Sequence, residues 1–398
     1  MSAPRRSLSP SGPQGQAFSR RRAVALAALA ALPAVGLFRV QGSAMTVDEF
    51  GGRVDIGGRA LYVESRGMGG PTVVFEAGYL GRSDVWSRDL KEPVGERTMV
   101  IPGVIPFART FTYDRPGTIG EVNSALDPTG PEFLPSRSDP VPQPRTIRDV
   151  VDDLHTVLGV CDVPGPYVLV GHSLGGLSMR LYASTYPEDV VGLVLVDATS
   201  EYTYPEFKKA LSPQDWARFD AMQTDHAALL DVYPEAEILF TAPEDEAETY
   251  TQMIEAEKAS PLRPMPLVVL SHGIPFAKPF PDWPTETMEG IMTDLQVRQA
   301  NLVPNGRHVV ADRSGHNIHQ DQPDLVIAAV QQVVEAVRDP STWPIEATPA
   351  ATPHARASDE ILTDTGSQPH LPEFRGGRAI DVLVCRSSCA GPVSTKCT

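Results

Sequence analysis

The sequence predicts an α/β fold with a mostly parallel central sheet flanked by helices. Short apolar runs rich in β-branched residues, typical of strands buried on both faces, alternate along the chain with amphipathic helical segments. Hydrophobic residues make up 41% of the 398 residues, which is ample for such a core. Residues 200–262 interrupt the alternation with a mostly helical, acidic stretch. We therefore expect a helical cap inserted after the sixth strand.

Eight strands are expected in chain order. Residues 53–56 and 59–65 predict a hairpin around Gly57-Gly58. Six further apolar runs predict strands at 72–76, 109–113, 167–170, 191–196, 266–270 and 308–311. Helices are expected around Trp86 and at 148–160, 174–186, 285–299 and 323–337. Residues 118–146, rich in Pro, Ser and Asp without periodicity, predict a long surface loop.

The chain is acidic, with a formal net charge of −16 and a pI of about 5.0. A surface of this sign repels nucleic acid and anionic membranes, so neither is expected as a partner. The acidity carries no information about the substrate.

The first 44 residues have the pattern of an export signal. Arg20-Arg21-Arg22 precedes an Ala-rich apolar stretch, 23–38, and small residues suited to cleavage follow at 42–44. The paired arginines resemble a twin-arginine signal, which implies export in the folded state. The apolar stretch is shorter than the roughly 20 residues that span a bilayer. We expect a secreted, periplasmic or cell-envelope protein, with anchoring by an uncleaved signal as the alternative.

Residues 339–398 predict a flexible tail because they are rich in Pro, Ala, Thr and Ser. Cys385, Cys389 and Cys397 lie in this tail, where a metal site or a disulfide stays open but no pattern supports either. Cys161 stands alone in the main body and is expected to be a small buried hydrophobic residue.

The motif that organises the chain is Gly-His-Ser-Leu-Gly at 171–175, between an apolar strand and a helix. In that context Ser173 is expected at a sharp, strained turn that points its hydroxyl out of the sheet. Side chains at positions 171 and 175 would clash with the adjoining strand and helix, so glycine is required at both. The helix that begins beside Ser173 directs backbone N–H groups toward any oxyanion formed there.

Five motifs in this order resemble the α/β-hydrolase superfamily, in its serine-esterase and lipase-like branch. They are EAGYLG after residue 75, YDRPG after 112, GHSLGG at the turn, LVLVDA after 192 and SGHNIHQDQP after 313. The resemblance covers about residues 50–338. It implies an α/β-hydrolase core formed by 45–199 and 263–338 around the cap, and it does not identify a substrate.

The resemblance implies Ser173 as the nucleophile and His316 as the base that activates it. His316 follows a strand and precedes the final helix, where the family carries its base. His172, His272 and His319 are expected to be surface or satisfied core histidines.

The acid of the triad is less clearly marked. Most of the superfamily carries it after the seventh strand, but here no Asp stands at the expected position beyond Leu270. Asp197 directly ends a buried strand, where an ionised carboxylate needs a partner. We therefore expect Asp197 to hold the His316 tautomer, with Asp282 as the main alternative. Glu286, Glu289 and Asp294 are weaker candidates.

The oxyanion hole implied by the resemblance consists of the backbone N–H groups of Leu174 and Tyr79, with Leu80 as the alternative second donor. Asp114 and Arg115 are expected to tie their loop to neighbouring backbone rather than to take part in chemistry.

The expected activity is hydrolysis of an ester, or of an amide, through an acyl-serine intermediate, on a small-molecule ester or acyl substrate. This chemistry requires neither a metal nor an organic cofactor. Acyl transfer to another acceptor, or cofactor-free perhydrolysis, needs the same triad and stays open. A non-catalytic binding protein on the same fold is the contrasting alternative. The sequence does not predict the oligomeric state.

Overall fold

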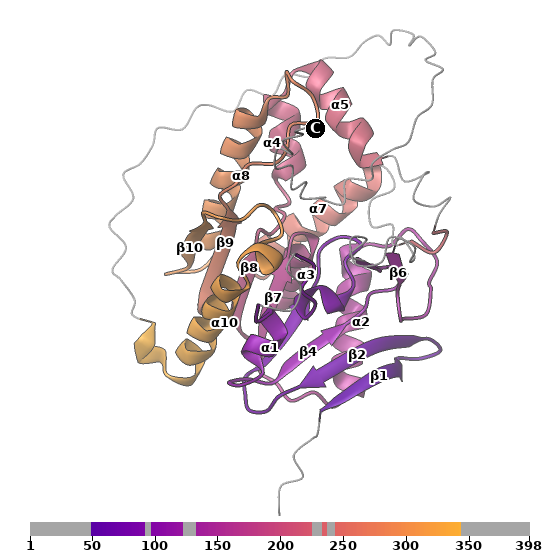
Figure 1. Cartoon of the computed structure of the whole chain (residues 1–398), viewed down its shortest axis with the longest axis vertical. Helices are drawn as coiled ribbons and strands as arrows, with labels where there is room; N and C mark the ends of the chain where they lie inside the picture. Colours follow the sequence, from indigo (N-terminus) through magenta and orange to yellow (C-terminus); the bar gives the residue numbers. More distant parts are fainter. Residues whose placement is uncertain (1–48, 92–96, 122–132, 225–232, 237–242, 344–398) are drawn as a thin grey trace, which may run out of the picture. The chain divides into compact units, whose positions relative to one another are not determined.

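The computed structural model describes residues 49–91, 97–121, 133–224, 233–236 and 243–343 (Figure 1). The predicted signal at 1–44 and the tail cysteines lie outside the described residues. Among the helices that are described, none combines the length and the apolar character needed to cross a membrane.

An eight-stranded sheet forms the centre, with the strand order β1-β2-β4-β3-β7-β8-β9-β10. Its strands are β1 (Phe50–Asp55), β2 (Ala60–Arg66), β3 (Thr72–Glu76), β4 (Thr110–Tyr113), β7 (Tyr167–His172), β8 (Val190–Val196), β9 (Leu267–His272) and β10 (Arg307–Ala311). Strand β2 is antiparallel to both of its neighbours, and all pairs from β4 to β10 are parallel. The mostly parallel sheet expected from the alternating pattern is therefore confirmed.

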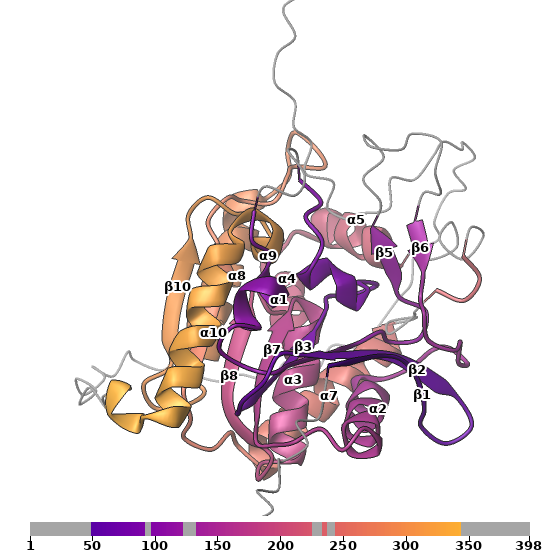
Figure 2. The same ribbon diagram turned by 60° about the horizontal axis from the view of Figure 1, so that its bottom comes forward.

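Helices cover both faces of the sheet (Figure 2). One face packs on α2 (Ile147–Val160) and α3 (Leu174–Thr185), and the other on α1 (Val100–Val104) and α10 (Pro323–Arg338). Alternate residues of each central strand enter the two cores: Leu169 belongs to the first, whereas Val168 and Val170 belong to the second. This double burial explains why the strands are continuous apolar runs.

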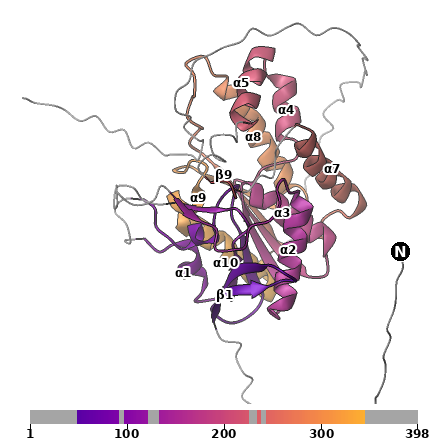
Figure 3. The same cartoon turned by 90° about the vertical axis from the view of Figure 1, so that its right-hand side faces the viewer.

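The predicted cap contains α4 (Thr203–Ala210), α5 (Pro213–Thr224) and α7 (Pro243–Ala259). Helix α8 (Thr285–Ala300), outside the predicted cap, packs beside α4 (Figure 3). Residues of α4, α5 and α8 and of the segments that flank α4 and α8 share one apolar cluster: Phe207, Leu211, Phe219 and Trp283, with Tyr204, Trp216, Met222, Met288, Ile291 and Met292 around them. The cap therefore has an aromatic core of its own, built partly on α8.

Several elements differ from the sequence predictions. The loop expected at 118–146 contains a two-stranded ribbon, β5 (Ile119–Glu121) with β6 (Phe133–Pro135). Helix α1 was not predicted, because Pro102 and Gly103 suggest a loop; proline is tolerated in a first turn, where its missing N–H has no partner to lose. A Cβ at Gly103 would lie 2.3 Å from Ile327 Cδ1, so glycine permits close packing on α10.

The ordered chain also extends beyond the predicted start of the tail at residue 339. A 3-10 turn, η2 (Pro340–Thr342), leads to Trp343, which is buried against the core. The Arg307 guanidinium lies 3.6 Å from the centroid of the Trp343 ring. The boundary of the described domain is therefore at least at residue 343. Cys161, expected to be buried, is half-buried at the end of α2.

Candidate active site

Ser173 lies in the turn between β7 and α3, with φ of 52° and ψ of −122°. A positive φ is strained for a residue with a side chain, and such strain concentrates at functional sites. A Cβ at Gly171 would lie 2.4 Å from the Gly175 carbonyl oxygen, and one at Gly175 would lie 2.6 Å from the Glu76 carbonyl oxygen. Both glycines are therefore required for this turn, as the sequence predicted.

Asp197 and His316 are hydrogen-bonded side chain to side chain. Asp197 follows β8, His316 follows β10, and His316 Nδ1 lies 2.6 Å from Asp197 Oδ2. The Asp197 side chain is fully buried, and its backbone has a φ of 44°. Because Nδ1 donates to the carboxylate, Nε2 of the neutral ring carries the lone pair that can accept a proton.

Ser173 belongs to the same end of the sheet as this pair. Its backbone N–H donates to the carbonyl of Val196, one residue before Asp197, at 3.1 Å. Its neighbour His172 donates through Nε2 to the backbone carbonyl of His316 at 3.0 Å. The centroids of the His172 and His316 rings are 4.7 Å apart. Within the described residues, Ser173 Oγ makes no hydrogen bond. Apo sites often have such an unformed contact between nucleophile and base.

A second histidine, His272 at the end of β9, also binds Asp197. Its Nδ1 lies 2.8 Å and 2.9 Å from the two carboxylate oxygens, and its backbone N–H donates to Oδ1. Its Nε2 lies 2.8 Å from Glu289 Oε2 on α8. Because both ring nitrogens face carboxylates, both must donate, and the ring is an imidazolium.

Sequence reasoning missed this arrangement. His272 was expected to be a surface or satisfied core residue. It is satisfied, but by two carboxylates. The available signal was a histidine directly after a buried strand; its partner Glu289 is 17 residues further along the chain.

The two imidazoles determine the charge of Asp197. Burial alone would raise the pKa of Asp197, but the hydrogen bonds from His272 and His316 outweigh it and hold that pKa well below the ordinary value. Burial opposes protonation of His272, yet Asp197 and Glu289 raise its pKa to about 10. Asp197 is therefore ionised and His272 protonated throughout the neutral range.

Two further histidines, His172 and His319, lie next to His316 and are uncharged. Burial, then the neighbouring His319 and His316 rings, hold the pKa of His172 well below its usual value. Burial and the proximity of His316 lower the pKa of His319 to about 3. His319 was expected to be exposed or satisfied, but it is buried against Trp86 and neither ring nitrogen has a hydrogen-bond partner in the described structure. The rings of His172 and His319 therefore place no charge next to His316.

The loop after β3 lies against the Ser173 turn. A Cβ at Gly78 would be 3.2 Å from Ser173 Cβ, so glycine allows this close approach. Arg115 holds the loop: it pairs with the Glu76 carboxylate and donates to the carbonyls of Ala77 at 2.9 Å and Gly78 at 2.7 Å. The Arg115 side chain therefore fixes the backbone of the loop that leads into Tyr79.

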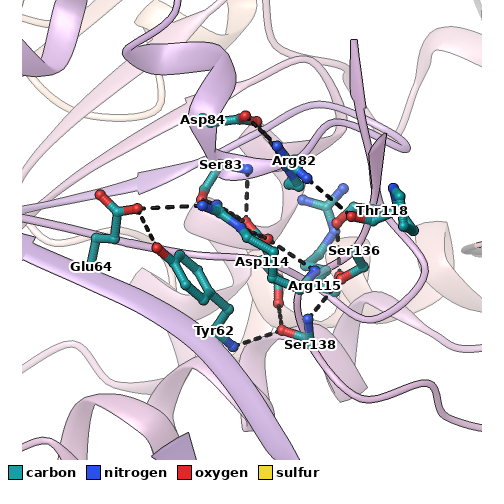
Figure 4. Close-up of polar contacts among 12 residues, drawn as sticks. Tyr62, Glu64, Arg82, Ser83, Asp84, Asp114, Arg115, Thr118, Ser136 and Ser138 are labelled. Carbon is teal, nitrogen blue, oxygen red and sulfur yellow. Dashed lines mark hydrogen bonds and ion pairs between the residues drawn. The ribbon is translucent and has the colours of Figure 1, made fainter. Parts of the chain in front are cut away.

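Asp114, next to Arg115, organises a polar network beside that loop (Figure 4). Its buried carboxylate accepts hydrogen bonds from the backbone and hydroxyl of Ser83, and from Arg137 Nε at 2.7 Å. Its carbonyl accepts from the Ser138 hydroxyl at 2.6 Å. Asp114 and Arg115 therefore tie loops together, as expected.

The other candidate acids do not reach His316. The Asp282 side chain is 67% exposed and pairs with Arg218 of α5 at 3.1 Å. Glu286 and Asp294 are exposed on α8. Of the weaker candidates, Glu289 alone joins the network, through His272.

A cavity of about 210 Å³ lies between α3, α7 and the residues after α8, lined among others by Arg180, Met253 and Leu302. None of Ser173, Asp197 and His316 lines it, so it is separate from this cluster. In the part of the chain that is described, no group of three or more His, Cys, Asp or Glu side chains is arranged to hold a metal ion.

The chain is similar in sequence to proteins from a fungus and a bacterium. It is 32% identical over 171 residues to "Probable transporter efuK" of Hormonema carpetanum, covering 42% of this chain but only 21% of that relative. It is 28% identical over 286 residues to the uncharacterized protein YqjL of Bacillus subtilis (strain 168), covering 70% and 89% of the two chains.

Among solved structures, a thermophilic esterase from Thermogutta terrifontis is 21% identical with a TM-score of 0.41, covering 70% of this chain and 94% of that one. The family model of the alpha/beta hydrolase family matches residues 67–329, which include strands β3 to β10, the cap and the Ser173, Asp197 and His316 cluster. With the parallel sheet and its strand order, this match identifies the chain as a member of the alpha/beta hydrolase family.

Proposed function

We propose that this protein is a serine hydrolase that cleaves an ester bond through an acyl-serine intermediate. The observation that carries the proposal is the 2.6 Å hydrogen bond from His316 to the buried Asp197, beside the strained turn of Ser173. A buried carboxylate that orients a histidine next to a serine on such a turn is the arrangement that activates a hydroxyl nucleophile.

In this mechanism His316 Nε2 accepts the proton of Ser173 as Oγ attacks the substrate carbonyl carbon. Asp197 stabilises the imidazolium, and the backbone N–H groups of Leu174 and Tyr79 bind the oxyanion. The tetrahedral intermediate collapses, the C–O bond to the leaving alcohol breaks, and His316 returns the proton to that alcohol. His316 then removes a proton from water as the water oxygen attacks the acyl carbon. The bond from that carbon to Ser173 Oγ breaks, His316 returns the proton to Oγ, and the acid is released.

The cap supports a small-molecule substrate with an apolar part. Its core is rich in aromatic side chains and lies on α4, α5 and α8. Phe276, in the loop after β9, adds a ring 5.5 Å from that of His316. Apolar walls with a few polar groups are typical of ligand sites.

We propose in addition that the protein is exported through its first 44 residues. The support is the arginine-rich start and the short Ala-rich apolar stretch in the sequence. A reporter fused to residues 1–44 should leave the cytoplasm, and changing Arg21 and Arg22 to Lys should retain it. Export that is indifferent to this change would contradict a twin-arginine route.

The hydrolase proposal is tested by labelling purified protein with a fluorophosphonate, which phosphonylates activated serines with loss of fluoride. Wild type should be labelled and Ser173→Ala should not. Ser178→Ala, which changes a buried serine on α3, the helix that follows Ser173, is the matched control and should be labelled. A folded wild-type protein that is not labelled would contradict the proposal and favour a non-catalytic binding protein on the same fold.

An ester panel then defines the reaction. Hydrolysis should release acid and alcohol with a burst of one equivalent per Ser173. Repeating the assay with added alcohols or hydrogen peroxide separates hydrolysis from acyl transfer and perhydrolysis, because those acceptors would compete with water for the acyl-serine.

A further inference from the structure

Four side chains from four different elements form one hydrogen-bonded chain: His316, Asp197, His272 and Glu289. The links measure 2.6 Å, 2.8 Å and 2.8 Å. The interior of this chain is closed to water, since the side chains of Asp197 and His272 are 0% and 6% exposed. Charges held in such a medium affect one another more strongly than in solvent.

Building on the proposed function, we propose that His272 and Glu289 are positioning residues that set the net charge felt by His316. His272 orients Asp197 by binding both of its oxygens, and Glu289 offsets the positive charge that His272 brings. Neither residue needs to touch the substrate. They act through Asp197.

The reason lies in the charge count. Asp197 alone would present one negative charge to His316, as in an ordinary triad. The His272 imidazolium cancels that charge, and Asp197 with His272 alone would stabilise a protonated His316 poorly. Glu289 restores a total of one negative charge. The backbone N–H of Phe276 fixes Glu289 through Oε1 at 2.8 Å.

The remaining ionisable groups around His316 leave this count unchanged. His172 on β7 and His319 on α9 (Ile318–Asp321) are neutral, for the reasons given above. Asp321 accepts from the backbone N–H of Gly315 at 2.9 Å and forms an ion pair with Lys91. The net charge next to His316 is therefore set by one group of side chains, Glu289, His272 and Asp197.

The test is the acidic limb of the kcat/KM profile against pH, measured on an ester. Glu289→Gln removes one negative charge and should move the limb to lower pH by about one unit. His272→Asn keeps a donor close to the position of Nδ1, removes the positive charge, and should move the limb to higher pH by a similar amount. The double variant restores the original count, so its limb should return close to that of wild type.

The opposite shifts and their cancellation distinguish charge from mere support. If both residues only brace the loops, each variant lowers kcat without moving the limb, and the double variant is the worst of the three. That outcome would overturn the inference. Glu286→Gln on the same helix removes an equal but exposed charge and should leave the limb in place.

A measurement on wild type covers variants that fail to fold. In protein with ¹³C-labelled histidine, one of the nine imidazoles should keep the chemical shifts of the protonated ring up to about pH 9, in line with the pKa of about 10 for His272. If every histidine titrates below pH 8, the inference fails. A protein without esterase activity or labelling contradicts the proposed function instead, so the two failures are distinguishable.

Discussion

Two of the buried carboxylates at the carboxyl end of the sheet differ in their partners. Glu76, the last residue of β3, and Asp197, just after β8, are each 1% exposed. Glu76 pairs with the Arg115 guanidinium and accepts from the Tyr113 hydroxyl. Asp197 is bound by the imidazoles of His316 and His272.

The partners decide what each carboxylate can do. A guanidinium stays charged at every pH a folded protein meets. Burial, and then the charge of Glu76, hold the pKa of Tyr113 well above its ordinary value, so that hydroxyl keeps its proton too. The Glu76 cluster is therefore a fixed anchor for the loop that leads to Tyr79. The Asp197 cluster contains imidazole rings, side chains that can accept and return a proton, which acid–base chemistry requires.

The largest expected effect comes from Asp197→Asn. The amide keeps the shape but cannot stabilise a His316 imidazolium, so kcat should fall about 10⁴-fold on an ester substrate. Circular dichroism should confirm the folded state. A loss of less than tenfold would remove Asp197 from the triad.

Glu76→Gln should affect stability instead. It leaves the buried Arg115 uncompensated, which typically costs about 3 to 5 kcal/mol. Urea unfolding should report this as a lower midpoint with an unchanged slope. At 15 °C, where the variant should still be folded, kcat should fall less than tenfold. If Glu76→Gln were as inactive as Asp197→Asn, the proposed difference in role between the two carboxylates would be wrong.

The stability contributed by His272 should depend on pH in a predictable direction. Burial opposes its protonation, but its two carboxylate partners raise its pKa from 6.5 to about 10. A raised pKa stabilises the fold fully below about pH 6.5, and that stability is lost as the pH rises toward 10. The full pKa shift of His272 corresponds to about 5 kcal/mol of stability. We expect about half of that value, because the hydrogen bonds between His272 and Asp197 also keep Asp197 charged and are shared by the two groups.

Comparing urea unfolding of wild type and His272→Asn at pH 6 and pH 9.5 isolates this contribution. Wild type should lose about 2 kcal/mol more than the variant between the two values. An equal loss in both proteins would show that His272 does not carry the pH dependence.

The smallest effect is expected for Asp282→Asn. This carboxylate is mostly exposed and pairs with Arg218 away from His316. Exposed pairs of this kind contribute little. Esterase activity and the fluorophosphonate labelling rate should match wild type within twofold. A large loss would reopen Asp282 as the acid.

The strands and the Ser173 turn were predictable because their signals are local. Apolar runs report burial on both faces, and the Gly-x-Ser-x-Gly pattern lies within five residues, although the close contact at Gly175 is with the distant Glu76 carbonyl. The pairing of Asp197 with His316 could be proposed from the buried strand end and the resemblance. It spans 119 residues of chain, so no local pattern could establish the distance.

His272 and Glu289 could not be predicted for a related reason. Their roles depend on α8 lying across the end of β9, and a sequence pattern gives no such placement. Trp343 was missed because the surrounding composition resembles a tail, whereas its burial depends on contact with the core. In both cases the missing information is tertiary.

Helix α8 has a consequence for the modularity of this enzyme. Met288, Ile291 and Met292 on α8 pack into the cap cluster. From the same helix, Glu289 binds His272 at the end of β9, and Gln296 and Gln299 donate to the Ala198 carbonyl after β8 at 2.8 Å and 3.0 Å. A chimera that exchanges only residues 200–262 would set a foreign cap against a native α8. Specificity grafts on this scaffold should therefore exchange the matching face of α8 together with the cap and retain Glu289, Gln296 and Gln299.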